Sequence, residues 1–265
     1  KDISRFHCVL WPALLLAAGV PLPRQVYVHG FIYARGERLS KSLGNVVDPV
    51  ALAKEYGADA LRFYLTAAFP TGRDGEFTLE QFVELANVRL ANELGNLASR
   101  TLTMVHKYFA AETPEAWRPE SLQEPAAREA LAALITSAQE AQRQVPLAYE
   151  ELRLNEAVGH AWQPVARANE FIERFKPWAV AKTEARRDEL GTALAALLET
   201  LRLAALWSWP VIPTKSEELW AMLSLPGTPG EVRGEAAVPR FGALPRRALG
   251  EVKGLFPRIE TSART

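Results

Sequence analysis

Arg38 and Lys41 lie three residues apart in the segment GERLSKSLGN, residues 36–45, which has a glycine toward each end. Ser40 and Ser42 place two hydroxyl groups beside these two cations. Cationic side chains, hydroxyls and backbone amides in such a loop can converge on one phosphate group, and a lysine ammonium on its flexible stem can follow a moving polyphosphate. The segment therefore predicts a loop that stabilises the charge of a leaving pyrophosphate; a solvent-exposed hairpin with incidental charges is the alternative.

Composition sets the limits for the rest of the chain. Its 265 residues are enough for one large domain or two smaller ones. The 31 basic and 31 acidic residues cancel, which argues against indiscriminate binding of polyanions and leaves room for a local nucleic-acid site. The single cysteine, Cys8, excludes internal disulfides and a cysteine-based metal cluster, so we expect no metal site and a cytoplasmic location. The apolar run at residues 11–20 is too short to span a bilayer, so no membrane partner is expected.

The first region, residues 1–76, mixes helical and strand patterns. The run RFHCVLWPALLLAAG, residues 5–19, predicts a buried helix that ends at Gly19. The β-branched and aromatic residues of RQVYVHGFIYARGE, residues 24–37, predict a strand with a turn at residues 35–36. Helix, strand and loop in this order are typical of the last part of an α/β domain, and no further parallel strand is evident that would complete a sheet.

Capping residues mark the helices that follow the basic loop. Asp48 precedes Pro49, which predicts an N-cap with proline at the first helical position. Gly57 is expected to end that helix, and Asp59 is expected to cap the next one. Thr78, with glutamine three residues later, has the pattern of a capping box.

The second region, residues 77–225, predicts a bundle of long amphipathic helices. Leu90, Leu94, Leu97 and Met104 fall on one apolar stripe, and Thr101 occupies the gap in it. After a proline-bearing loop at residues 112–124, helices are expected at 125–144, 148–175, 177–209 and 215–223. The third region, residues 226–265, is rich in Gly, Pro and Arg and predicts an extended strap with a frayed end. The expected fold class is mainly α.

The basic segment resembles a family motif. RLSKS followed by LGN is similar to the second signature motif of class I aminoacyl-tRNA synthetases, usually Lys-Met-Ser-Lys-Ser. Arg38 stands where lysine is usual and Leu39 where methionine is usual, and both keep the charge or the apolar character. Lys41, the lysine on which the family relies most, is intact. The resemblance implies that Lys41 and Arg38 are catalytic and that Ser40 and Ser42 contact ATP.

Other strings narrow the resemblance to one family. KDISRFHCVLWPALLLAAG, VHGFI and NVVDP…YGADALRFYL resemble bacterial-type methionyl-tRNA synthetases. The resemblance implies that residues 1–76 are the C-terminal part of a Rossmann-like catalytic domain with the basic loop and the stem-contact region. It implies that residues 77–225 are the anticodon-binding helical bundle, followed by the strap at residues 226–265.

The resemblance also assigns roles to single residues. Asp2 would accept hydrogen bonds from the ribose hydroxyls of the adenylate. Ile3, His7 and Trp11 would form the methionine pocket, where a thioether binds by dispersion. For His7 and Trp11, plain core packing is the alternative. The adenine would lie against His29, Gly30 and Ile32, where glycine lets the backbone come close.

Four residues of the helical region have types that suit an unpaired base. Asn96 and Arg100 share a helix face beside the apolar stripe, and an amide beside a guanidinium can hydrogen-bond a base edge. Trp178 follows Pro177 at a helix junction, where an indole can stack on a splayed base. The alternatives are a solvated helix shoulder and a tryptophan that fills the junction. In the family, matching residues read the anticodon, which implies that Trp178 stacks on its first base and that Asn96 and Arg100 contact that base or its neighbour.

The resemblance implies a complete activity that this chain shares only in part. Methionine and ATP, with Mg²⁺ accompanying ATP as substrate, would give methionyl-adenylate and then methionyl-tRNA(Met). The chain has no His-Ile-Gly-His string and none of the cysteines of the zinc-bearing insertion. We therefore expect it to work with the N-terminal half of a catalytic domain, to bind no ATP and activate no methionine alone, and to be a monomer. A stand-alone tRNA-binding module, or a structural bundle with a chance loop resemblance, are the alternatives.

Overall fold

The computed structural model describes residues 1–34, 37–38, 47–115 and 117–260; for residues 37 and 38 it describes the backbone alone. The α-helices are α1 (Trp11–Ala17), α2 (Pro49–Tyr56), α3 (Ala58–Ala67), α4 (Leu79–Leu85), α5 (Asn96–Phe109), α6 (Pro125–Glu150), α7 (Leu154–Phe175), α8 (Pro177–Val180), α9 (Arg187–Ser208) and α10 (Pro213–Met222). The strands are β1 (Ile32–Ala34), β2 (Glu37–Arg38) and β3 (Gly75–Glu76). Among the described residues, two segments are π-helical (Phe6–Leu10, Ala86–Gly95) and four are 3₁₀-helical (Pro119–Ser121, Glu184–Arg186, Pro229–Glu231, Gly234–Ala237).

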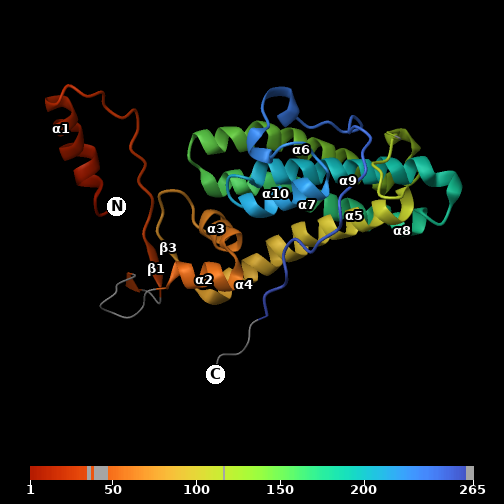
Figure 1. Cartoon of the computed structure of the whole chain (residues 1–265), viewed down its shortest axis with the longest axis horizontal. Helices are drawn as coiled ribbons and strands as arrows, with labels where there is room; N and C mark the ends of the chain where they lie inside the picture. The colour runs from red at the N-terminus through yellow and green to blue at the C-terminus, as the bar shows by residue number, and fades with distance from the viewer. Residues whose placement is uncertain (35–36, 39–46, 116, 261–265) are drawn as a thin grey trace.

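Helices α5, α6, α7 and α9 form the main bundle, with α9 at its centre (Figure 1). Helix α9 is apolar on nearly every side, so burial on all sides satisfies its sequence. By length and hydropathy, Glu184–Ser208 is the one helix of the described residues that is able to cross a membrane, and 94% of its apolar window is buried inside the protein. The apolar character of this helix is therefore accounted for by its place in the core.

Most helix signals of the sequence are confirmed. The Asp48 side chain accepts a hydrogen bond from the backbone N–H of Val50 at 2.8 Å, with proline at the first helical position of α2. Gly57 ends α2 with a φ of 91°, which favours glycine. The Thr78 hydroxyl accepts from the N–H of Gln81 and begins α4. The predicted apolar stripe is buried from Leu90 to Met104, with Thr101 fully enclosed.

The expected cap at Asp59 is wrong. Asp59 lies inside the first turn of α3, is 5% exposed, and its Oδ2 accepts from the backbone N–H of Lys215 at 2.7 Å. The carboxylate thus satisfies the first turn of α10 rather than that of its own helix. Burial raises its pKa above the usual value for aspartate, and the hydrogen bond from Lys215 opposes this shift only in part.

This raised pKa gives a prediction for the pH dependence of stability. The folded state binds a proton at Asp59 more tightly than the unfolded state does, so the contribution of Asp59 to stability rises as pH falls from its folded pKa toward the usual aspartate pKa of 3.8. In Asp59→Asn, an amide oxygen can still accept from Lys215 and this contribution is absent. We expect the variant to be at least as stable as the parent at pH 7. At pH 4, its free energy of unfolding, measured with urea, should be lower relative to that of the parent than at pH 7. A relative gain for the variant at pH 4 contradicts the prediction.

The sheet contains a parallel pair that the sequence did not indicate. Strand β1 pairs with β2 in antiparallel fashion and with β3 in parallel fashion, in the order β2-β1-β3. The absence of any further parallel strand was therefore a wrong expectation, because two-residue β3 is too short to show alternation. The strand predicted over residues 24–37 is confirmed only at β1 and β2, and its turn at residues 35–36 lies outside the described residues.

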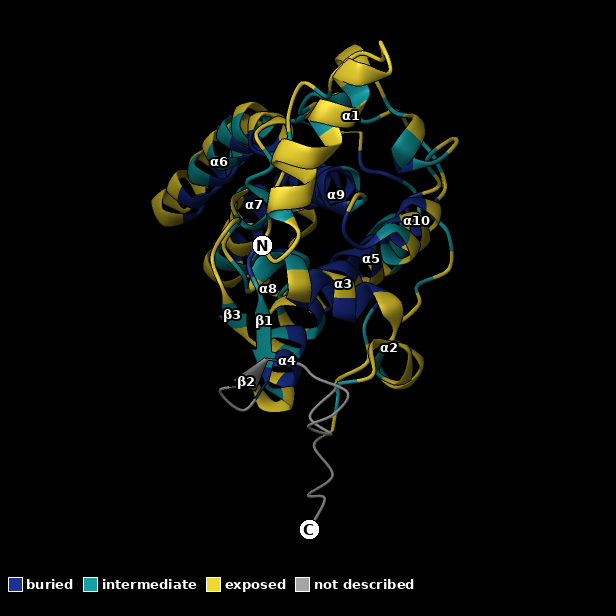
Figure 2. Ribbon diagram, turned by 90° about the vertical axis from the view of Figure 1, so that its left-hand side faces the viewer, coloured by how far each residue is buried: buried dark blue, intermediate teal, exposed yellow. Residues whose placement is uncertain are grey.

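The N-terminal helix is not buried within this chain, contrary to the sequence prediction. The π-helical turn Phe6–Leu10 and α1 have no buried residue; α1 stands apart from the bundle (Figure 1) and is mostly exposed (Figure 2). Leu14 is 68% exposed and Leu16 is 66% exposed. The apolar pattern indicates a face that other residues cover, but in the described part of the chain no residue does so. Gly19, with a φ of 68°, ends the helix as expected.

Two predicted helix boundaries were also wrong. Pro146 does not interrupt α6, which continues to Glu150, and the break falls at residues 151–153 instead. Leu152 there has a φ of 57°, and Arg153 N–H bonds back to the Ala148 carbonyl at 2.8 Å. The helix expected over residues 177–209 is divided into α8, a 3₁₀ turn and α9. The expected interruption at residues 112–124 is confirmed, and it contains one short 3₁₀ turn.

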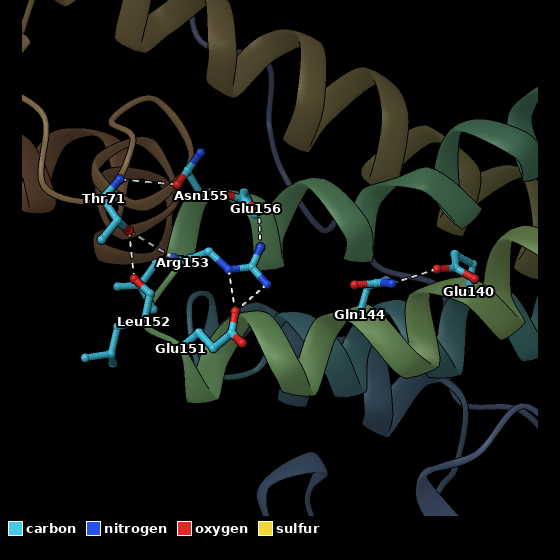
Figure 3. A network of polar contacts seen from close by, with 9 residues as sticks. Thr71, Glu140, Gln144, Glu151, Leu152, Arg153, Asn155 and Glu156 are labelled. Atoms are coloured by element: carbon cyan, nitrogen blue, oxygen red, sulfur yellow. Dashed lines mark hydrogen bonds and ion pairs between the residues drawn. The ribbon is translucent and has the colours of Figure 1, made fainter.

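Thr71 connects the sheet region to the bundle (Figure 3). Its hydroxyl donates to the Leu152 carbonyl at 2.7 Å and accepts from the Leu154 N–H at 3.2 Å. Its own N–H donates to Asn155 Oδ1 at 3.3 Å. The loop between α3 and β3 is thereby held on the turn between α6 and α7, and the same turn is closed by ion pairs of Arg153 with two glutamates.

We expect Thr71→Val to destabilise the chain by about 1–3 kcal/mol, because it leaves a part-buried carbonyl and a part-buried N–H unpaired. Urea unfolding with an unchanged m-value measures this loss. Thr66→Val is the matched control, because the Thr66 hydroxyl bonds only within its own helix, to the Arg62 carbonyl, and should change stability by less than about 0.5 kcal/mol. Equal losses in the two variants contradict a connecting role for Thr71.

The last segment, residues 226–260, runs over the bundle mostly without helix or strand and does not pair in the sheet (Figure 1). The Thr113 N–H bonds the Arg247 carbonyl at 3.0 Å, and the Leu249 N–H bonds the Ala111 carbonyl at 2.7 Å. Near its end, the Ile259 backbone makes two hydrogen bonds with the Asn87 side chain, at 2.8 and 3.0 Å. Backbone and side-chain groups elsewhere in the chain therefore satisfy backbone groups of this segment, whose described regular structure is limited to two 3₁₀ turns and one bridge to Glu112.

Candidate nucleic-acid interface

The basic segment is described only at its start. Strand β2 pairs with β1 so that Arg38 lies opposite Tyr33 in the register. The Arg38 side chain and the whole of Lys41, Ser40 and Ser42 lie outside the described residues, so their roles stay predictions. The described backbone shows where the segment departs from the sheet, which is beside the parallel pair of β1 and β3.

The residues assigned to the methionine pocket lie on the N-terminal turn and α1. His7 Nδ1 lies 3.0 Å from the Ile3 carbonyl oxygen, and its ring meets the Trp11 ring edge-on with centroids 6.1 Å apart. Within this chain, all three are on the surface or partly so, with Ile3 60% and Trp11 42% exposed. Core packing of His7 and Trp11 against the described residues is therefore contradicted. Asp2 lies at the exposed start of the same turn.

The residues assigned to adenine gather at one cavity. His29, Gly30 and Ile32 line a hollow of about 280 Å³ together with residues of the α3–β3 loop. The structure itself requires glycine at position 30, since a Cβ there would lie 1.8 Å from the Arg73 carbonyl oxygen. The close backbone approach at Gly30 is thus made by the chain itself. His29 Nδ1 lies 2.8 Å from the Gly30 carbonyl oxygen, which fixes the ring beside that contact.

At the opposite end of the bundle, the structure brings Arg100 and Trp178 together from separate helices. The Arg100 guanidinium lies 5.4 Å from the Trp178 ring centroid, within the range of a cation–π contact. Trp178 is in the first turn of α8 and 41% exposed, while Pro177 before it is buried. Lys176, with a φ of 52°, makes the turn between α7 and α8 that aims the indole at α5. Asn96, exposed at the start of α5, lies one helical turn from Arg100.

Sequence reasoning missed a third member of this group, Glu173. Arg100 Nη2 donates to Glu173 Oε1 at 2.8 Å, and Glu173 is in the last turn of α7. The pair is exposed, with 28% of the arginine and 64% of the glutamate side chain accessible, so it adds little to stability. Its effect is to hold the guanidinium over the indole with further N–H donors available. No pattern along the chain could have found it, since 73 residues separate the two.

This arrangement can hold an unpaired base by two means. The exposed indole offers a face for stacking, and the guanidinium and the Asn96 amide offer hydrogen bonds to a base edge. In the described part of the chain, no group of three or more His, Cys, Asp or Glu side chains converges as metal ligands do.

Comparisons with known proteins show what the chain as a whole resembles. Residues 1–102 match the family described as tRNA synthetases class I (M). The chain superposes on the Mycobacterium tuberculosis methionyl-tRNA synthetase bound by methionyl-adenylate with a TM-score of 0.84 at 35% identity, covering 97% of this chain and 48% of that one. The apo form of the same enzyme gives a TM-score of 0.82 at 35% identity, covering 98% and 48%. Both solved structures that the chain resembles are methionyl-tRNA synthetases, and the resemblance extends over nearly the whole of this chain.

The chain is also similar to curated methionine–tRNA ligases. It is 39% identical over 262 residues to Methionine--tRNA ligase 1 of Bacillus cereus, covering 98% of this chain and 38% of the relative. It is also 39% identical over 263 residues to Methionine--tRNA ligase of Caldanaerobacter subterraneus subsp. tengcongensis, covering 98% and 39%. The chain thus spans about two fifths of the curated relatives it matches and about half of the solved enzyme. These relatives are enzymes.

Proposed function

We propose that this chain is the C-terminal part of a methionine–tRNA ligase and supplies anticodon recognition and the basic ATP loop. The observation that carries the proposal is the meeting of Arg100, Glu173 and Trp178 at one end of a bundle whose whole length resembles methionyl-tRNA synthetases. An indole for stacking beside an oriented guanidinium is chemistry that suits a single-stranded anticodon.

The proposed reaction begins with attack of the methionine carboxylate on the α-phosphorus of ATP, which releases pyrophosphate. Lys41 and Arg38 neutralise the charge that grows on this leaving group. Asp2 holds the ribose through its hydroxyls, and the adenine lies against His29, Gly30 and Ile32. Catalysis of this kind consists of positioning and charge stabilisation, and it needs no covalent nucleophile from the protein.

The proposed division of labour has this chain inactive when isolated. The exposed apolar residues of the N-terminal turn, among them Ile3 and Trp11, have no cover within the described chain, as expected for a pocket shared with other residues. Methionine-dependent exchange of pyrophosphate into ATP tests this point. If the purified chain exchanges pyrophosphate into ATP faster with methionine than without it, the proposal of inactivity is contradicted.

Anticodon recognition is tested by gel shift with two RNAs. We expect the chain to bind methionine tRNA more tightly than the same tRNA with an exchanged anticodon. A stand-alone tRNA-binding module without a catalytic partner is the second candidate, and it predicts the same discrimination without any activity in the complete protein. Equal binding of both RNAs contradicts anticodon recognition under either candidate.

A further inference from the structure

The π-helical segment Ala86–Gly95 joins α4 to α5 without a break, so that residues 79–109 form one continuous helix. A π-helix has i→i+5 hydrogen bonds, is rare, and occurs mostly as a single turn, frequently at functional sites. The segment here is ten residues long. It ends where the candidate nucleic-acid interface begins, at Asn96.

The spacing of the buried side chains suits this winding. Apolar residues that are 5% exposed or less recur at every fourth position: Phe82, Ala86, Leu90, Leu94, Ala98 and Leu102. In an α-helix each step of four passes a full turn by about 40°, so five steps would carry the series about 200° around the axis. The i→i+5 segment winds more slowly than an α-helix and offsets this drift, so the whole series stays buried. The direction in which the first turns of α5 face therefore depends on where the π-helical segment ends.

Two side chains of α7 donate hydrogen bonds to carbonyls of the π-helical segment. Trp162 Nε1 donates to the Arg89 carbonyl at 3.3 Å, and Asn169 Nδ2 donates to the Glu93 carbonyl at 3.1 Å. The two donors are seven residues apart, which places them on one face of α7. The acceptor residues also pair through their own side chains, with Arg89 Nη1 3.0 Å from Glu93 Oε2. Helix α7 therefore holds the segment at two points.

The second of these points lies where the π-helix gives way to α5. The backbone N–H of Asn96 also bonds the Glu93 carbonyl, so Asn169 shares its acceptor with the first residue of α5. Gly95 suits the winding at this end, because a Cβ there would lie 3.1 Å from the Leu90 carbonyl oxygen, five residues earlier. Asn169 and Gly95 thus both favour an end of the π-helix at this position.

We propose that Asn169 is a positioning residue for anticodon recognition, and the inference rests on the proposed function. By fixing the end of the π-helical segment, it makes Asn96 and Arg100 face the Trp178 indole. Successive residues lie about 100° apart around a helix axis, so an end shifted by one residue turns the first turns of α5 by a comparable angle. The Arg100 guanidinium, 5.4 Å from the indole centroid, loses its contact in such a rotation. Glu173, which also holds Arg100, follows Asn169 by one turn on the same face of α7.

Asn169→Leu removes the donor without adding a charge, and filter binding at fixed salt measures its effect on two RNAs. For methionine tRNA we expect binding at least about fivefold weaker, the lower end of what one lost base stack gives. For the anticodon-exchanged tRNA we expect little change. Asn169→Gln keeps the carboxamide and should recover part of the affinity. Gln163→Leu is the matched control, because Gln163 is an exposed amide of the same helix with no hydrogen bond to the described part of the chain.

Two further variants separate positioning from a general loss of stability. Gly95→Ala is expected to weaken the binding of methionine tRNA while the urea midpoint stays near that of the parent, because alanine favours a helix more than glycine does. In the Trp178→Ala background, Asn169→Leu should weaken binding no further. Two residues that act through one contact have non-additive effects, whereas independent effects add.

The failure of this inference differs from the failure of the proposed function. If the parent chain binds both tRNAs equally, anticodon recognition itself is contradicted. If the parent discriminates, three results overturn the role of Asn169: Asn169→Leu binds as the parent does, it weakens both RNAs equally, or it adds its full effect to that of Trp178→Ala. If urea unfolding shows that Asn169→Leu does not fold, Gly95→Ala decides, and unchanged discrimination by that variant overturns the inference.

Discussion

Glu199→Ala is expected to destabilise the chain by about 3–5 kcal/mol, because it leaves a buried arginine without its counter-charge. Glu199 is 0% exposed and receives two hydrogen bonds from the Arg202 guanidinium, at 2.7 and 2.8 Å. Arg202 is itself 5% exposed. Domain stabilities are of the order of 5–15 kcal/mol, so the loss is a large share of the total.

The same pair fixes the strap on α9, which makes the effect local as well as global. Arg202 also donates to the carbonyls of Ala236 and Val238, at 2.8 and 2.7 Å. The Arg240 N–H donates to Glu199 Oε1 at 2.6 Å. Without the carboxylate, the Arg240 N–H loses its acceptor, and we expect faster hydrogen exchange at residues 236–240 in addition to the lowered urea midpoint.

Glu140→Ala is the matched control for this prediction. Glu140 also pairs with an arginine three residues away, Arg143, but this pair is on the surface. Its removal should change stability by less than about 0.5 kcal/mol. A loss below about 1 kcal/mol in Glu199→Ala, or unchanged exchange at the strap, contradicts the prediction and indicates that water replaces the carboxylate.

The sequence predicts well those features that are decided within one helical turn. The caps at Asp48 and Thr78 need only a side-chain oxygen and an N–H two or three residues later. The apolar stripe from Leu90 to Met104 depends on helical periodicity, which no distant residue alters. The extent of α6 was mispredicted, because the other contacts of a long buried helix outweigh the local preference against an internal proline such as Pro146.

The features that sequence reasoning missed depend on contacts between distant residues. Asp59 bonds a backbone N–H 156 residues away, and Thr71 bonds the α6–α7 turn 81 residues away. Arg100 and Trp178 were both chosen from the sequence, but their contact requires the turn at Lys176. For the candidate site, the residue types were therefore predictable, whereas their assembly, including Glu173, was not.

Trp178→Ala is expected to weaken the binding of methionine tRNA by about 1–3 kcal/mol, the usual value of one base stacked on an aromatic ring. This corresponds to roughly a five- to 150-fold rise in the dissociation constant. The indole is 41% exposed and contacts Arg100 from the side of α8. Its removal therefore takes away the stacking surface without leaving a cavity in the core. Filter binding at fixed salt measures the change, because affinity for RNA depends on ionic strength.

Two further variants separate stacking from a general loss of surface. Trp178→Phe keeps an aromatic face and should recover part of the lost RNA affinity. If Trp178 only filled the helix junction, the phenyl ring would restore the free energy of unfolding and not the affinity. Leu147→Ala removes a 43% exposed apolar side chain from α6, away from α8, and should leave binding unchanged. If Trp178→Ala binds methionine tRNA as the parent does, or if it weakens the anticodon-exchanged tRNA equally, then the indole does not read the anticodon. A loss confined to the cognate RNA connects the Arg100–Trp178 contact to recognition, since phosphate contacts alone carry no sequence information.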